Sequence, residues 1–350
     1  QPRPKLLCIL LRIGVATMGR LSKDKRDIYY REAKQKGFRA RSAFKLLQID
    51  EELDLLQGVR RVADLCAAPG SWSQVLAMRL FEEHRQLQDA REDVREGNDG
   101  ERVKRIKGIG PPCIVAVDKY EMEPIDGVVQ VQGDITHAST ASAVLGHFGG
   151  ELADLVVCDG APDAIFRCDF DEYVQHQLVL SELLLAKALL RPGGAFVAKI
   201  FRGEHACEVY ALLQRTFDEV LCCKPRASRN SSQEAFVVCR GFRPNHSVLD
   251  RPGKPDFFYS PDLHEELVYV GPGAPALVVP FVSCGGPGCL DADTNYAVSA
   301  NHQVLAPVAP PRDAPYLEAI AERRLGRAQN HPVSSAAPPA AAAAAAMDVP

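Results

Sequence analysis

A segment with the residue types of a ligand-binding turn spans residues 64–72 and reads D-L-C-A-A-P-G-S-W. It follows a buried-strand pattern and precedes a helical one. In a doubly wound sheet ligands bind beyond the carboxyl ends of the strands, so this turn is the expected ligand contact. Gly70 would allow close backbone approach, and Trp72 would cover the ligand. The pyrophosphate fingerprint G-x-G-x-x-G is absent, which favours a cofactor without phosphates over a dinucleotide.

Three acidic residues follow three successive predicted strands. Asp118 ends the second strand, where a carboxylate can bind the two hydroxyls of a ribose. Asp134 follows the third strand, where it can accept a hydrogen bond from an adenine amino group, and Asp159 ends the fourth. Each alone could be a helix cap or a turn residue. Together with the turn at Gly70, they predict one cofactor site at the edge of a sheet.

A basic segment precedes the first strand. Residues 18–45 hold ten Lys or Arg against three Asp or Glu, with four aromatic residues interleaved, whereas the whole chain of 350 residues has a net charge of −4. Basic residues interleaved with aromatics are typical of surfaces that bind a phosphate backbone and stack on bases. A solvated helix face is the alternative interpretation. A second, smaller basic cluster consists of Lys224, Arg226 and Arg229.

Strand and helix patterns alternate between residues 61 and 240. Short apolar runs typical of buried strands occupy residues 62–67, 114–117, 128–131, 155–158, 195–200, 220–223 and 235–239. Helical patterns occupy residues 72–87, 138–148, 172–190 and 206–217. This alternation predicts an α/β fold with a mostly parallel, seven-stranded sheet and helices on both faces.

The remaining segments depart from the alternation. Residues 82–107 hold eight acids and seven bases without apolar periodicity, so we expect a solvated insertion at about 82–112. Residues 244–333 are rich in Pro and Gly, with one strand-like run at 276–284, and predict an irregular C-terminal extension. Residues 334–350 are a low-complexity alanine tract. Residues 1–17 precede Met18, a natural start, and are interpreted as an upstream extension.

Composition excludes several classes of protein. Hydrophobic residues make up 46% and charged residues 25% of the chain, which is typical of a globular protein and excludes collagen and coiled coil. Eleven cysteines without a C-x-x-C pair argue against a zinc ribbon and a disulfide scaffold, and favour a reduced, intracellular protein. No metal site is predicted. The apolar run at residues 6–11 is too short to span a bilayer. Arg12 ends this run, which argues against its being the hydrophobic region of a signal peptide.

The ordered motifs resemble the FtsJ-type RNA ribose 2′-O-methyltransferases, which use S-adenosylmethionine, and most closely their eukaryotic cytoplasmic tRNA branch. The resemblance covers residues 18–240 and rests on six motifs: R-A-R-S-A-F-K-L at 39–46, the turn at 64–72, G-D-I-T at 133–136, C-D-G-A-P-D at 158–163, G-A-F-V-A-K-I-F at 194–201 and S-R-N-S-S-Q-E-A-F at 228–236. The tail motif V-P-F-V-S-C-G at 279–285 also resembles the tRNA enzymes.

The resemblance implies roles for individual residues. The catalytic set of the family falls on Lys45, Asp159, Lys199 and Glu234. Its S-adenosylmethionine contacts fall on Gly70, Trp72, Asp118, Asp134 and Asp159. Together with the basic segments, it implies RNA contacts at Lys23, Lys25, Arg26, Arg39, Arg41, Lys224, Arg226 and Arg229. The fold implied is a Rossmann-like methyltransferase domain at 18–243 with strand order 3-2-1-4-5-7-6 and a basic N-terminal helix.

A ribose 2′-hydroxyl is a poor nucleophile, so methyl transfer to it needs a base within hydrogen-bond reach. Lys199 ends an apolar strand, where desolvation is expected to lower the pKa of its amine, and a nearby Lys45 would lower that pKa further. The neutral amine would then be the general base, oriented with the sugar by Asp159 and Glu234. A surface lysine whose stem covers apolar residues is the alternative.

The resemblance further implies that the substrate is the tRNA anticodon loop at nucleotides 32 and 34, in the cytoplasm. It also implies WD-repeat and helical-repeat (HEAT or armadillo type) partner proteins that select the nucleotide. Three alternatives stay open: a ribosomal RNA 2′-O-methyltransferase, a catalytically silent RNA-binding subunit and a small-molecule methyltransferase. The basic segments argue against the last of these, and retention of Lys199 and Asp159 argues against the silent subunit.

Overall fold

The computed structural model describes residues 27–96, 110–162, 168–203, 206–244, 278–286, 288–294, 296–297 and 305, excluding the side chains of residues 90–96 and 168–171. Its helices are α2 (Ile28–Lys36), α3 (Ala43–Leu53), α4 (Ser71–Glu96), α6 (Ala138–His147), α7 (Cys168–Leu189) and α8 (Ala206–Thr216). Its strands are β1 (Arg61–Leu65), β2 (Cys113–Asp118), β3 (Val128–Gln132), β4 (Ala153–Cys158), β5 (Leu190–Phe201), β6 (Phe217–Pro225), β7 (Glu234–Phe242) and β8 (Phe281–Cys284).

The strands form one sheet with the order β3-β2-β1-β4-β5-β7-β6-β8. Strands β1 to β5 pair in parallel, and β7 lies antiparallel between β5 and β6. The order of the first seven strands confirms the prediction. The predicted strand count was wrong by one, because β8 from the C-terminal extension adds to the sheet by pairing in parallel with β6.

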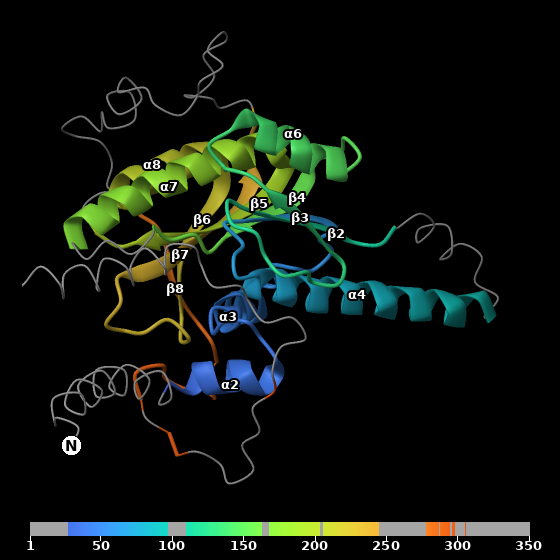
Figure 1. Ribbon diagram of the computed structural model, residues 1–350, viewed down its shortest axis with the longest axis horizontal. Coiled ribbons are helices and arrows are strands. Elements are labelled where there is room, and N and C mark those ends of the chain that lie inside the picture. The colour runs from blue at the N-terminus through green and yellow to red at the C-terminus, as the bar shows by residue number, and fades with distance from the viewer. Residues whose placement is uncertain are drawn as a thin grey trace, which may run out of the picture. The chain divides into compact units, whose positions relative to one another are not determined.

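Helices cover both faces of the sheet, as the alternating pattern predicted (Figure 1). Helices α6, α7 and α8 pack on one face over a core that includes Val156, Leu183 and Phe196. Helices α3 and α4 lie on the other face, where Leu46, Ile49 and Leu76 are fully buried. The central strands are buried on both faces because both layers are apolar, which explains their short continuous apolar runs.

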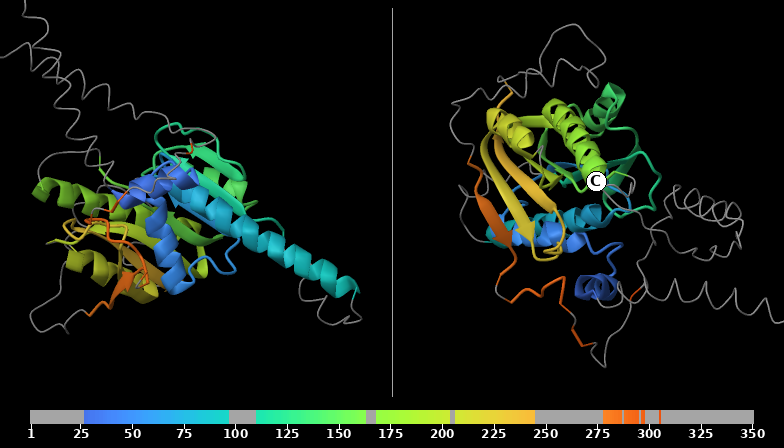
Figure 2. Two further views of the ribbon diagram at one scale, coloured as in Figure 1. Left: turned by 90° about the horizontal axis from the view of Figure 1, so that it is seen from below. Right: turned by 90° about the vertical axis from the view of Figure 1, so that its left-hand side faces the viewer.

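The first crossover helix is longer than the sequence pattern indicated. We predicted a solvated insertion from residue 82, but α4 continues to Glu96 and extends beyond the sheet (Figure 2). Its exposed part is held by local side-chain pairs, including an ion pair between Arg85 and Glu82 and a 2.9 Å hydrogen bond from Gln86 to Glu82. Such pairs stabilise a helix without an apolar stripe, so periodicity could not find it. Residues 97–109 lie outside the described part of the chain.

The N-terminal segment forms two helices rather than one. Asp27 caps the start of α2 by accepting a 3.1 Å hydrogen bond from the Tyr30 N–H, and Gly37 ends it in the left-handed conformation with φ 73°. Part of the C-terminal extension contacts α2, since the Tyr29 hydroxyl donates to the Leu290 carbonyl at 2.5 Å. No described helix is long and apolar enough to cross a membrane. The predicted segments 1–17 and 334–350 lie outside the described residues.

Candidate active site

The turn between β1 and α4 packs closely against the side chains around it. Gly70 has φ 100°, and a Cβ at this position would lie 2.7 Å from the Ile125 Cδ1 atom and 2.9 Å from an Arg39 guanidinium nitrogen. Only glycine fits here, because the conformation is left-handed and the Ile125 and Arg39 side chains fill the space. The predicted contact between Gly70 and a cofactor stays a prediction. Asp118 stabilises the turn by accepting a 2.8 Å hydrogen bond from the Ala68 N–H, and its other oxygen accepts from the Tyr120 N–H.

Asp134 follows β3 at the same edge of the sheet and its carboxylate is exposed. One of its oxygens accepts hydrogen bonds from the Thr136 hydroxyl at 2.7 Å and the Thr136 N–H at 2.8 Å. The hydroxyl bond is the main reason why the pKa of Asp134 lies below its ordinary value. The side chain is therefore an ionised hydrogen-bond acceptor at the edge where a cofactor is expected.

Trp72 does not present its ring to a ligand. Its side chain is 2% exposed, packs 5.6 Å from the Phe236 ring and donates a 2.9 Å hydrogen bond to the Ser42 carbonyl. The Lys45 amine in turn lies 5.5 Å from the centre of the Phe236 ring. The prediction that Trp72 covers a ligand is therefore wrong for its side chain, which supports the residues beneath Lys45 instead.

Four charged side chains that are distant in the sequence meet at the carboxyl edge of the sheet. The Lys45 amine from α3 donates to the Glu234 carboxylate at 2.7 Å and lies 3.7 Å from the Asp159 carboxylate. The Lys199 amine donates to the Asp159 carbonyl oxygen at 2.7 Å and lies 3.1 Å from its carboxylate. The four side chains are 7 to 16% exposed. The structure thus brings together the whole predicted set of Lys45, Asp159, Lys199 and Glu234.

The electrostatics of this cluster differ from the sequence expectation in one respect. Burial lowers the pKa of Lys199, but Asp159 and Glu234 raise it more, so its pKa lies above the ordinary value. The expectation of a depressed lysine pKa was wrong because it counted desolvation and left out both carboxylates. For Glu234, burial acts to raise the pKa, but Lys45 and Lys199 outweigh it and lower the pKa to about 2. The surrounding charges therefore favour the protonated amine of Lys199 and the ionised carboxylate of Glu234.

Two buried polar residues that the sequence analysis did not single out make hydrogen bonds beneath the site. Gln175 of α7, 1% exposed, donates to the Lys199 carbonyl at 2.8 Å and to the Gly160 carbonyl at 3.3 Å. Asp64 of β1 accepts a 2.5 Å hydrogen bond from the Ser73 hydroxyl of α4. Burial raises the pKa of Asp64 to about 7. The sequence signal that could have identified Gln175 and Asp64 is a polar residue inside an otherwise apolar strand or helix face.

Two residues predicted to contact RNA have internal roles instead. Arg39 is buried, and its guanidinium donates to the carbonyls of Pro69, Glu123 and Pro124 at 2.7 to 3.1 Å. Lys224 is also buried and donates to the Ser228 hydroxyl at 3.0 Å. Both predictions were wrong because a charged residue that hydrogen-bonds to groups inside the fold cannot be told from a surface residue in the sequence.

The other predicted RNA contacts have mixed outcomes. Arg41 and Arg229 both pair with the buried Asp27 carboxylate, the latter at 2.9 Å, and are 22% and 30% exposed. Arg226 is exposed and makes a 3.4 Å hydrogen bond to the Cys289 carbonyl. These three lie on the surface and stay predictions. Lys23, Lys25 and Arg26 lie outside the described residues.

A Rossmann-like sheet with a glycine turn, acidic strand ends and a Lys-Asp-Lys-Glu cluster defines the class of RNA ribose methyltransferases that the motifs resembled. The family model described as FtsJ-like methyltransferase matches residues 38–242, and the chain belongs to this family. Membership of a methyltransferase family implies S-adenosylmethionine as the methyl donor, and the exposed, ionised Asp134 carboxylate at the carboxyl edge of the sheet is a hydrogen-bond acceptor suited to this cofactor.

Two relatives are similar over most of their length. The chain is 46% identical over 329 residues to the tRNA (cytidine(32)/guanosine(34)-2′-O)-methyltransferase of Homo sapiens, covering 91% of both chains. It is 47% identical over 305 residues to the protein of the same name from Schizosaccharomyces pombe, covering 87% of this chain and 97% of that one. The ribosomal RNA large subunit methyltransferase E of Methanothrix thermoacetophila is 36% identical over 218 residues, or 62% of this chain and 73% of that protein.

Proposed function

We propose that this protein transfers a methyl group from S-adenosylmethionine to ribose 2′-hydroxyls of the tRNA anticodon loop, at nucleotides 32 and 34. The observation that carries the proposal is the convergence of Lys45, Asp159, Lys199 and Glu234 beside the Gly70 turn. The substrate is supported by the names of the relatives that match about nine tenths of the chain.

The residues around the proposed acceptor, a ribose 2′-hydroxyl, have different roles in methyl transfer. S-adenosylmethionine, when bound, supplies an electrophilic methyl group. The Lys199 amine is the proposed base for the 2′-hydroxyl proton, since it lies at the end of its strand beside Asp159. Because its pKa is raised, Lys199 must first lose a proton, so the neutral base is a minor form at neutral pH. Lys45 and Glu234 hold each other at 2.7 Å and would fix the ribose.

Two alternative functions are distinguished by coverage and geometry. A ribosomal RNA substrate is disfavoured because the ribosomal relative matches 62% of the chain, whereas the tRNA relatives also match the segment that includes β8. A silent RNA-binding subunit has no need of the charge cluster. Transfer of labelled methyl groups to purified tRNA, ribosomal RNA and free nucleosides distinguishes these functions. Labelling of ribosomal RNA alone would overturn the proposal. Labelling of none of the three substrates by folded protein that binds S-adenosylmethionine would overturn it as well.

We also propose, on the family resemblance, that the protein acts in the cytoplasm with a WD-repeat partner and a helical-repeat partner that select between nucleotides 32 and 34. Ribose mapping of tRNA from cells that lack this protein, or either partner, tests the assignment. Loss of both modifications without this protein, and of one modification without each partner, is the expected result. Loss of both marks without either partner would contradict the division of labour.

A further inference from the structure

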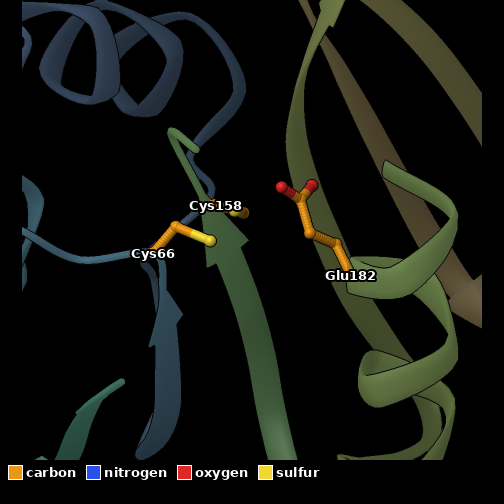
Figure 3. Close-up of side chains that lie close together, drawn as sticks. All are labelled: Cys66, Cys158 and Glu182. Atoms are coloured by element: carbon orange, nitrogen blue, oxygen red, sulfur yellow. The ribbon is translucent and has the colours of Figure 1, made fainter. Parts of the chain in front are cut away.

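Three side chains outside the Lys-Asp-Lys-Glu cluster converge behind the carboxyl edge of the sheet. Cys66 follows β1, Cys158 is the last residue of β4, and Glu182 lies on α7. Strands β1 and β4 are neighbours, with Leu65 opposite Cys158, which places the two cysteines side by side. One ligand atom from each residue, two sulfurs and a carboxylate oxygen, lies within 4.8 Å of the others (Figure 3).

The Glu182 carboxylate is unusual in this cluster. It is 0% exposed, and neither of its oxygens has a hydrogen-bond partner of normal geometry. One oxygen lies 2.9 Å from the position that a Cβ on Gly160 would occupy, so the carboxylate is pressed against the backbone that follows Asp159. An uncompensated buried carboxylate is costly unless a proton, a cation or a metal neutralises it. Figure 3 shows it directed toward the region of the two sulfurs.

We propose that Cys66, Cys158 and Glu182 form a binding site for a zinc-like divalent cation. Two thiolates and a carboxylate are a donor set that Zn²⁺ accepts, with bonds of about 2.0 to 2.3 Å in a tetrahedron. Such bonds put ligand atoms roughly 3.5 to 4 Å apart. The three ligand atoms all lie within 4.8 Å of one another, which exceeds that spacing by at most about 1 Å. Binding replaces the thiol protons, which are released to solvent.

The fourth coordination position faces the cofactor turn. Cys158 and Glu182 are fully buried, whereas Cys66 is partly exposed, so an ion would enter and take a water from the Cys66 side. The bound ion would tie together the ends of β1 and β4 and helix α7. It would thereby fix the distance between the turn at Gly70 and the strand end that carries Asp159, without touching the acceptor hydroxyl.

The ligands are 92 and 24 residues apart along the chain, far from the spacing of a zinc ribbon, which explains why no metal site was predicted from the cysteines. The described part of the chain offers a matched control in a second pair of interacting buried thiols, Cys223 and Cys284. Among the described residues, no third His, Cys, Asp or Glu ligand atom lies close enough to this pair to complete a metal site.

Titration of the reduced, full-length protein with Co²⁺ tests the proposal, because thiolate-bound tetrahedral Co²⁺ has intense near-ultraviolet and visible bands. We expect one equivalent of Co²⁺ to bind, and one equivalent of Zn²⁺ to displace it. Glu182→Gln, which keeps the size of the side chain, should weaken Co²⁺ binding at least tenfold. Cys158→Ser should remove most of the thiolate-to-metal band, and Cys284→Ala should leave the spectrum unchanged.

Circular dichroism of the metal-free proteins establishes that each variant is folded. If Cys158→Ser does not fold, Glu182→Gln and Cys66→Ser decide the question with the same spectra. Absence of thiolate-bound Co²⁺ in the parent protein would overturn the proposal and leave a protonated Glu182 hydrogen-bonded to a thiol. An unchanged Co²⁺ affinity in Glu182→Gln, or loss of the bands in Cys284→Ala, would overturn it as well, since the metal would then lie elsewhere.

Discussion

At the scale of single residues, the mechanism depends on the protonation of Lys199. We expect Lys199→Ala and Lys199→Arg to lose methyl transfer by about 10² to 10⁴-fold, with S-adenosylmethionine and RNA affinities near the parent values. Arginine keeps the charge beside Asp159 but does not release its proton. Single-turnover rates measure the effect, and Lys187→Arg on α7 is the matched control. Substantial turnover by Lys199→Arg would make Lys199 a positioning residue.

The raised pKa of Lys199 also predicts the pH dependence of that rate. The neutral amine increases tenfold per pH unit below its pKa, and the two carboxylates place that pKa above the ordinary 10.5. The single-turnover rate should therefore rise with pH without a plateau until the protein loses its structure. A plateau near pH 8 would mean that substrate binding displaces the carboxylates, or that another group is the base.

Arg39 gives a further test at this scale. Its three bonds to the carbonyls of Pro69, Glu123 and Pro124 hold the cofactor turn. Arg39→Lys should weaken S-adenosylmethionine binding about tenfold, since charged hydrogen bonds contribute about 1.5 to 3 kcal/mol each. It should leave the salt dependence of RNA binding unchanged. The exposed Arg226→Ala should do the opposite and reduce the salt slope by about 1. Calorimetry with each ligand separates the two outcomes.

At the scale of elements, α4 has two parts with different roles. Its first turns contribute Leu76 and Leu80 to the core, and Glu83 still accepts a 3.0 Å hydrogen bond from the Gly58 N–H. Beyond this point its side chains pair only with one another among the described residues. Replacing residues 85–107 with a short Gly-Ser linker should therefore change the melting temperature by only a few degrees. A fall of more than 10 °C, or loss of activity, would show that the distal helix packs on part of the fold.

The contact between α2 and the C-terminal extension is a second feature at this scale. The Tyr29 hydroxyl donates to the Leu290 carbonyl and accepts a 3.0 Å hydrogen bond from Gln48. Tyr29→Phe leaves both groups unsatisfied and should destabilise the protein by about 1 to 3 kcal/mol. Faster hydrogen exchange across α2, with unchanged exchange in the central strands, is the expected signature. Unchanged exchange in α2 would mean that other contacts hold it.

At the scale of the whole molecule, buried carboxyl groups set the pH dependence of folding. The lowered pKa of Glu234 contributes stability above pH 4.5 that is lost as the pH falls toward 2, on the order of 3 kcal/mol. The raised pKa of Asp64 acts in the opposite direction. Its contribution is fully present below pH 3.8 and is lost as the pH rises through 7. Urea unfolding of Asp64→Asn should therefore show a smaller decrease in stability between pH 4 and 8 than the parent.

The order of the first seven strands, the glycine turn and the grouping of the four proposed catalytic side chains were all predictable from sequence. Apolar runs and turn residues act over a few neighbours, and the family motifs lie at the strand ends where any parallel sheet places its ligands. The sequence alone therefore determined the class of fold, and its resemblance to the family predicted that Lys45, Asp159, Lys199 and Glu234 act together.

Only the tertiary structure decided the charge state of Lys199, the burial of Arg39 and Lys224, and the pairing of β8 with β6. A pKa depends on the sum of desolvation and every nearby charge, and two carboxylates distant in sequence reverse the sign expected for an apolar strand. In the sequence, Arg39 and Lys224 resemble surface charges, because only folding brings their carbonyl and hydroxyl partners to them. The meeting of Cys66, Cys158 and Glu182 likewise exists only once β1, β4 and α7 have packed.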